Sequence, residues 1–263
     1  MKRLLNIALD NAVALGVVVI VLFLIIPLPT FLLDFLLIVN IGLAIMILMI
    51  TMNISEALEF SIFPSLLLVT TLFRLGLNVS STRMILRDGY AGEVIQNFGQ
   101  LITGGNIVIG VVIFLIIVLV QFIVITKGAE RVAEVAARFT LDAMPGKQMA
   151  IDADLSSGLI NEQEARARRQ KIQKEADFYG AMDGATKIVK GDAVMSIVIT
   201  LINFVGGVII GMVMGGGDFT TVLQTYSIVT IGDGLVSQLP ALMISTATGM
   251  IVTRSVSDGS MNT

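Results

Sequence analysis

The chain has 263 residues, of which 55% are hydrophobic and only 14% are charged. Soluble domains carry about 25% charged residues, so the runs of about 20 apolar residues in this chain indicate an all-α, polytopic membrane protein. The net charge of −3 argues against a nucleic-acid partner, and the absence of cysteine and histidine excludes disulfides, thiolate chemistry and histidine-based metal sites.

The first part of the chain, residues 1–126, predicts four transmembrane helices. These spans cover about residues 12–26, 32–52, 62–79 and 107–126. Lys2 and Arg3 precede the first span, so the positive-inside rule places the amino terminus in the cytoplasm. A helix near residues 90–104 is apolar on one face only, and we expect it to lie on the membrane or against a partner subunit.

The third predicted span contains a charge, Arg74. A charge at the centre of a membrane helix costs about 2.5–3.5 kcal/mol on insertion scales, so this side chain is expected to face protein or water instead of lipid. Two interpretations stay open. Arg74 pairs with a carboxylate such as Asp34 or lies near the interface, or it takes part in a conduit.

The only long polar segment covers residues 127–192 and holds 11 of the 17 basic and 11 of the 20 acidic residues. Its basic content predicts a small cytoplasmic insert domain between the fourth and fifth spans. Helices are expected at about 130–139 and 161–179, and Pro145-Gly146 predicts a turn between them. The charged residues around that turn are Arg138, Asp142, Lys147, Asp152 and Asp154. A plain solvated loop between membrane helices is the alternative.

Residues 193–254 predict two further spans. In the fifth span, Gly207 and Gly211 have the small-xxx-small spacing that lets helix backbones approach closely. The sixth carries Asp233 between two glycines, with a proline seven residues later, so we expect a discontinuous helix broken near residues 232–240. A loop ahead of a short last span is the alternative. Residues 255–263 are expected to form a polar tail or the start of a linker.

Charge at or near the membrane is the only chemistry that these residues offer. The sequence has no nucleotide-binding loop, catalytic triad or metal-ligand spacing, so we expect neither an enzyme nor a cofactor or metal. Asp192 comes directly before the fifth span, where a carboxylate can bind a proton or pair with Lys187 or Lys190. The candidate charges are Arg131, Arg138, Asp142, Lys187 and Asp192 on the cytoplasmic side, and Arg74 and Asp233 in the membrane.

Three long stretches carry a family resemblance. They are LDAMPGKQMAIDADL at 141–155, EADFYGAMDGATKIVKGDA at 175–193 and IGDGLVSQLPALMISTATG at 231–249. They resemble the FHIPEP family, the large membrane subunits of bacterial type III protein export gates, and the resemblance covers essentially the whole chain.

The resemblance implies an inner-membrane, multi-pass subunit that forms a homo-oligomeric ring in the lipid bilayer. It further implies contact with other export-gate subunits and with unfolded protein substrates, whose export the proton motive force drives. The positions that match charges implicated in the family's energy coupling are Arg131, Arg138, Asp142, Lys187, Asp192 and Asp233. The family pattern also includes two more spans and a large cytoplasmic domain that docks chaperone–substrate complexes, and neither is expected within this chain.

Two other functions stay open. One is an ion-coupled small-molecule transporter or ion channel, with a carboxylate site at Asp233 in a discontinuous helix. The other is a structural membrane scaffold in which every charge is a packing pair.

Overall fold

The computed structural model describes residues 12–104, 106–123, 130–215 and 218–254, and within these ranges every regular element is a helix. The elements are α2 (Ala12–Ile25), α3 (Thr30–Asn53), the 3-10 helix η1 (Ala57–Phe60), α4 (Phe63–Asp88), α5 (Glu93–Thr103), α6 (Ile107–Ile123), α7 (Glu130–Ser156), α8 (Glu162–Gly215) and α9 (Phe219–Arg254). The predicted all-α class is therefore confirmed. Residues 1–11, 124–129 and 255–263, with the predictions made for Lys2, Arg3, Lys127 and the polar tail, lie outside the described residues.

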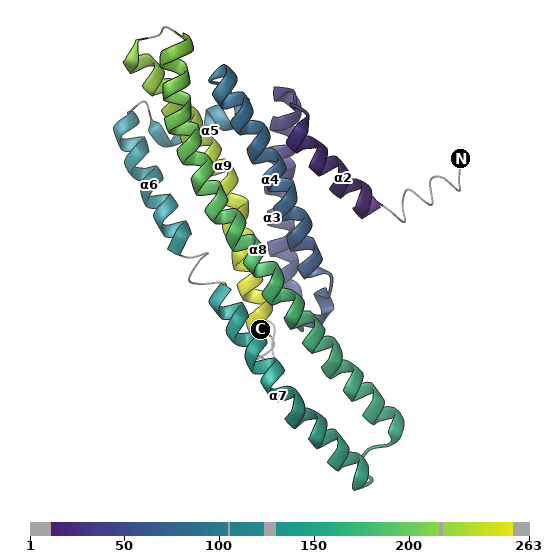
Figure 1. Cartoon of the computed structure of the whole chain (residues 1–263). Helices are drawn as coiled ribbons and strands as arrows, with labels where there is room; N and C mark the ends of the chain where they lie inside the picture. Colours follow the sequence, from purple (N-terminus) through teal and green to yellow (C-terminus); the bar gives the residue numbers. More distant parts are fainter. Residues whose placement is uncertain (1–11, 105, 124–129, 216–217, 255–263) are drawn as a thin grey trace, which may run out of the picture.

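Helix α9 is the centre of the bundle (Figure 1). It contacts α3, α4, α5, α6, α7 and α8, and 67% of its most apolar stretch is buried inside the protein. Membrane helices approach one another closely where their side chains are small, and α9 is rich in Gly, Ser, Thr and Ala between Thr230 and Gly249.

Four of the described helices are long and apolar enough to cross a membrane: α3, α4, α8 and α9. A fifth span results if α5 and α6 are counted together, although they meet at an angle of 102°. Helix α2 has 14 residues, or about 21 Å, which is less than the roughly 30 Å of a hydrocarbon core. The described residues thus supply four or five of the six predicted spans.

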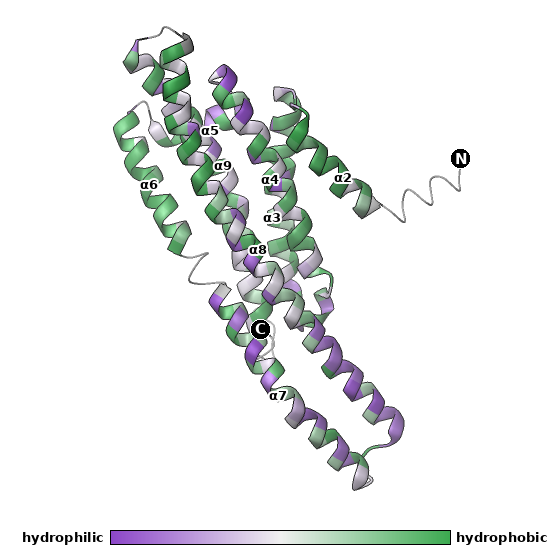
Figure 2. Ribbon diagram, in the orientation of Figure 1, coloured by the Kyte–Doolittle hydropathy of each residue, from purple (hydrophilic) through white to green (hydrophobic). Residues whose placement is uncertain are grey.

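Helix α8 has 54 residues and is continuous from the polar segment into the apolar one. Its first part, residues 162–191, pairs with α7 to form what we call the hairpin. Exposed side chains on α8 are mostly polar up to Lys187 and mostly apolar from Ile188 onward, as the change in colour along this helix in Figure 2 shows. The second helix of the polar segment therefore continues without a break into the fifth predicted span.

The turn predicted at Pro145-Gly146 is wrong. Both residues lie inside α7, and the chain reverses only after Ser156, where Gly158 has a left-handed φ of 74°. Asn161 and Glu164 then cap α8 reciprocally, each side chain accepting from the other's backbone N–H at 2.9 and 3.1 Å. A helix loses one backbone hydrogen bond at an internal proline, so Pro145 locally favours a turn. Packing of α7 along α8 outweighs this preference.

The break predicted near residues 232–240 is also wrong, as is the alternative loop. Helix α9 is continuous through Gly232, Gly234 and Pro240. Proline is tolerated in buried membrane helices because neighbouring elements fix the backbone. The glycines serve close approach instead: a Cβ on Gly232 would collide with the carbonyl oxygen of Ile95 in α5.

Helix α5 is amphipathic, as predicted, but its buried face packs on its own chain. Ile95, Gly99 and Thr103 form that face, and Gly99 lies against the backbone of Ile228 in α9. The expectation that this face covers the membrane or a partner subunit is therefore corrected, while Leu101 on the other side stays 77% exposed.

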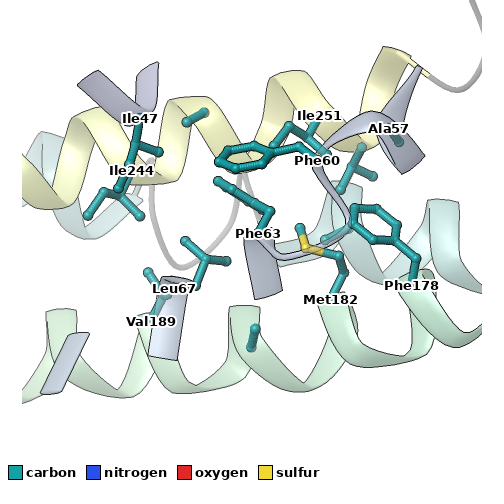
Figure 3. Close-up of a cluster of buried hydrophobic side chains, with 14 of the residues drawn as sticks. Ile47, Ala57, Phe60, Phe63, Leu67, Phe178, Met182, Val189, Ile244 and Ile251 are labelled. Atoms are coloured by element: carbon teal, nitrogen blue, oxygen red, sulfur yellow. The ribbon is translucent and has the colours of Figure 1, made fainter. Parts of the chain in front are cut away.

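An apolar cluster joins the hairpin to the bundle (Figure 3). Phe60 and Phe63 pack at a ring-centroid distance of 5.4 Å between α8 and α9. Met182 of α8 and Ile251 of α9 are fully buried in the same cluster. Burying such side chains is worth about 1.5–3 kcal/mol each, so this cluster fixes α8 at the point where it leaves the hairpin.

Candidate functional site

The candidate site begins with a buried ion pair between α4 and α8. Nη2 of Arg74 lies 2.6 Å from Oδ2 of Asp192, and each side chain is 1% exposed. The sequence suggested Asp34 as the partner of Arg74, and Lys187 or Lys190 as the partner of Asp192. Those pairings are replaced by a contact between two helices that lie far apart in the chain.

The surroundings of Arg74 and Asp192 are poor for stability. A charge removed from water costs several kcal/mol, and pairing offsets this only when hydrogen bonds satisfy the remaining polar atoms. Apart from the contact between Nη2 and Oδ2, no polar atom of either side chain has a hydrogen-bond partner within the described part of the chain. An intramembrane ionisable pair of this kind is a functional candidate.

Asp233 forms a second buried carboxylate site. Nδ2 of Asn203 on α8 donates to its Oδ2 at 2.9 Å, and the hydroxyl of Ser81 on α4 also faces this carboxylate. Asp233 is 3% exposed and Asn203 is fully buried. A carboxylate on α9 is thus tied to both α4 and α8.

The two sites belong to one line of buried polar side chains, which we call the polar seam. It consists of Thr71, Arg74, Asn78 and Ser81 on α4, Asp192, Ser196, Thr200 and Asn203 on α8, and Asp233 and Ser237 on α9. On α4 and α8 these residues recur every three or four positions, so each series follows one face of its helix. Ser237 Oγ donates to Asn78 Oδ1 at 2.7 Å and links α9 to α4.

Three charged residues of the stretch at 141–155 form ion pairs that hold the two helices of the hairpin together. Lys147 pairs with Glu175 at 3.0 Å and Asp154 with Arg168 at 3.2 Å. Asp152 pairs with Arg169, again from α7 to α8. All of these side chains are partly exposed, and Pro145 and Gly146, directly before Lys147, are also exposed on α7.

The remaining predicted charges are exposed on the hairpin and do not gather around Asp192. Arg131 is exposed, and Arg138 lies 3.7 Å from Asp142 on the same face of α7. Lys187 bonds Asp183 one turn away at 2.7 Å. The predicted cytoplasmic cluster is therefore divided between a solvated surface and one buried carboxylate.

Asp34, which the sequence suggested as a partner of Arg74, and Arg83 serve instead as helix caps. Asp34 accepts from the backbone N–H groups of Glu93 and Val94 at 2.9 and 3.0 Å and so caps the start of α5. Arg83 donates to the carbonyls of Leu24 and Ile25 at the end of α2. Sequence reasoning also missed Asn203, Asn78 and Ser237, although polar residues at helical spacing within apolar spans could have indicated them.

The glycines of the fifth and sixth predicted spans accommodate aromatic rings. Gly207 and Gly211 lie against Tyr226, and a Cβ on Gly211 would fall 2.6 Å from a ring carbon. A Cβ on Gly234 would fall 2.6 Å from the ring of Phe114 in α6. These contacts let α8 and α6 approach α9 and keep the polar seam enclosed.

The chemistry available at the seam is that of carboxylates, one guanidinium, amides and hydroxyls. Within the described residues, no group of three or more carboxylates is placed to hold a metal ion. The seam can bind a proton at Asp192 or Asp233, can bind water, and can change the pairing of Arg74.

Comparison with known proteins gives consistent matches. The FHIPEP family model matches residues 20–263. The flagellar biosynthesis protein FlhA of Bacillus subtilis (strain 168) is 59% identical over 252 residues, which are 96% of this chain and 37% of that protein. FlhA of Salmonella typhimurium is 54% identical over 239 residues, 89% of this chain and 34% of that protein.

The low calcium response locus protein D of Yersinia pestis is 53% identical over 251 residues, 95% of this chain and 36% of that protein. The chain therefore spans only about a third of the length of these relatives. No solved structure matches it.

Proposed function

Because the chain belongs to the FHIPEP family, we propose that it is a multi-pass inner-membrane subunit of a bacterial type III protein export apparatus of the flagellar kind. In this proposal it forms a homo-oligomeric ring beside other export-gate subunits, with its amino terminus and hairpin in the cytoplasm. The ring couples the proton motive force to the export of unfolded proteins. The names of relatives such as FlhA of Bacillus subtilis support the flagellar assignment.

The buried pair of Arg74 and Asp192 is the observation that carries the coupling. Asp192 lies on the same continuous helix as the hairpin, within one turn of Val189, the last α8 residue of the apolar cluster that joins hairpin and bundle. Proton binding at Asp192 removes one of the two charges and with it the attraction between α4 and α8. A proton that binds here therefore weakens the electrostatic interaction between α4 and α8, the helix that continues into the hairpin.

The exposed charges suit a different part of the same function. Arg131, Arg138, Asp142 and Lys187 remain in contact with solvent, where a proton site gains little from its surroundings. We assign them to contacts with other subunits, and Asp233 to a second proton site deeper in the bundle.

The transporter or channel alternative loses the observation that motivated it, because α9 is not discontinuous at Asp233. It still predicts flux of a solute or ion through liposomes that contain only this protein. The scaffold alternative predicts that neutral substitutions along the seam change stability alone.

Secretion and motility of cells carrying Asp192→Asn in the whole protein test the proposal. This change preserves side-chain size and removes the charge. We expect export to fall more than tenfold while membrane insertion and assembly continue. Glu162→Gln, the same acid-to-amide change on an exposed position of α8, is the matched control and should export normally.

Normal export by Asp192→Asn would make this carboxylate a structural charge and would move the coupling role to Asp233. Ion flux through liposomes without any export partner would instead favour the channel alternative.

A further inference from the structure

Several buried polar atoms along the polar seam and beside it have no hydrogen-bond partner in the described part of the chain. They belong to Thr71 and Arg74 on α4, to Asp192 and Asn203 on α8, and to Ser227, Thr230 and Gln238 on α9. Buried polar groups in proteins are nearly always satisfied by other protein groups or by ordered water. A run of such atoms between α4, α8 and α9 therefore points to water inside the bundle.

The spacing of polar residues on α8 suits a chain of water molecules. Asp192, Ser196, Thr200 and Asn203 are all less than 9% exposed and lie on one face of the helix. Residues four apart are separated by about 6 Å along the helix axis. That distance is about twice the length of an O–H···O hydrogen bond, which is the separation that one water molecule spans. Thr200 Oγ1 donates to the backbone carbonyl of Ser196 at 2.9 Å, so this hydroxyl meets water as an acceptor. The four residues together span about 16 Å, roughly half of a hydrocarbon core.

The upper end of this series reaches α9 at Asp233. Gly234 brings the backbone of α9 close to Thr200, because a Cβ built on this glycine would lie 3.6 Å from Thr200 Oγ1. The next polar residue on α8, Asn203, donates to Asp233 at 2.9 Å. Its own carbonyl oxygen Oδ1 is buried without a protein partner and is free to accept a hydrogen bond from water.

We propose that a chain of water molecules runs along the polar seam from Asp192 to Asp233, with Ser196, Thr200 and Asn203 as its fixed hydrogen-bonding steps. The path lies within one subunit and needs no gap between subunits. The water chain would connect the two carboxylates that the proposed function treats as proton sites. The inference rests on the proposed function only for that role of Asp192 and Asp233.

Cysteine accessibility tests the path directly, since the chain has no cysteine of its own. Ser196→Cys and Thr200→Cys are made separately in the intact protein in native membranes, with any cysteine outside these 263 residues replaced by serine. The membranes are exposed to Ag⁺, then denatured, and the thiols that remain are labelled with a maleimide and counted by mass. Thiols react as thiolates, which form only where water reaches them. We expect both variants to be protected by Ag⁺ at least tenfold faster than the controls.

The controls share the depth of the test positions. Val198→Cys lies on the same helix but faces outward, where Val198 is 46% exposed. Ile231→Cys is buried among apolar side chains of α5 and α6 next to the seam. Variants are compared only when their membrane insertion equals that of the unmodified protein, and Asn203→Cys, at the last step of the path on α8, replaces either test variant that fails to insert.

Protection of Ser196→Cys and Thr200→Cys no faster than that of Ile231→Cys would mean that the seam is dry, and the inference would be wrong whatever Asp192→Asn does to export. Rapid protection together with normal export by Asp192→Asn would uphold the water path and refute only the coupling role of Asp192.

Discussion

Arg74 and Asp192 differ from every other described ion pair in their surroundings. The pairs of the hairpin, such as Arg168 with Asp154, are partly exposed, and pairs of that kind contribute only about 0–1 kcal/mol. Both members of the seam pair are 1% exposed, so removal of one leaves a buried charge without its partner. The loss of one partner of a buried pair typically costs about 3–5 kcal/mol.

Arg74→Gln should therefore destabilise the protein by about 3–5 kcal/mol, because it strands the carboxylate of Asp192. The double variant with Asp192→Asn should recover most of this loss, since neither charge is then buried alone. Thermal unfolding of the purified protein in detergent measures both effects. Equal destabilisation by the single and double variants would show that Arg74 does not stabilise the protein by pairing with Asp192.

The sequence identified the charged members of the site but not their partners. Arg74, Asp192 and Asp233 stand out because a charge within apolar sequence is costly wherever it lies. Which helix faces Arg74 depends on how the bundle packs, and no periodicity within α4 contains that information. Asn203 escaped notice for a related reason: an uncharged amide in a membrane helix is common, and only its contact with Asp233 sets it apart.

At the level of elements, Pro145 provides a sharp test of the continuous α7. A proline inside a helix costs up to about 3 kcal/mol relative to alanine, whereas a proline that begins a turn helps to form it. Pro145→Ala should consequently stabilise the hairpin, and amide hydrogen exchange at residues 141–149 of the intact protein should slow about tenfold or more.

Gly158→Ala is the matched comparison, because this glycine occupies the turn that the hairpin actually uses. Its φ of 74° suits glycine, and an alanine there costs about 1–2 kcal/mol. Exchange in the hairpin should accelerate. The opposite pair of results, with Pro145→Ala destabilising and Gly158→Ala neutral, would place the turn at Pro145.

Two glycines of α9 differ in whether a neighbouring helix packs against them, and alanine substitutions at both test that difference. A Cβ on Gly232 would overlap the backbone of Ile95, so Gly232→Ala must push α5 away and should cost about 1–3 kcal/mol. Gly249 has no atom within 4 Å of the same position, and Gly249→Ala should be neutral or slightly stabilising. Melting temperatures in detergent distinguish them, and an equal response would argue against close contact of α5 with α9.

Glycine and proline explain where the predicted elements failed. Both residues were taken as signals of a turn or break, which is their preference in an isolated chain. In α7 and α9 packing against neighbouring helices overrides that preference, and in α9 the glycines Gly232 and Gly234 permit close approach of α5 and α6. The amphipathic pattern of α5 correctly predicted that one face of this helix is buried. The pattern does not contain the identity of the covering surface, which is α9 of the same chain.

For the molecule as a whole, the decisive feature is that hairpin and polar seam share one helix. The apolar cluster around Phe63 and Met182 holds α8 at the junction, and Asp192 follows Val189, the last α8 residue of this cluster, within one turn. An unbroken α-helix transmits a displacement of the hairpin to Asp192 without loss at a hinge. Motion of the hairpin and pairing of Arg74 are thereby linked through the backbone itself.

Gly184→Pro tests this link, because residue 184 lies on α8 between most of the hairpin and Asp192. Its surroundings are open, with no atom within 4 Å of an added Cβ, so the substitution acts on the backbone and not on packing. Proline there removes the hydrogen bond to residue 180 and kinks the helix. Export by the whole protein should fall more than tenfold while membrane insertion and the Ag⁺ accessibility of Ser196→Cys stay unchanged. Gly184→Ala preserves the helix and should export normally. Full export by Gly184→Pro would mean that the hairpin acts through partner subunits instead of through α8.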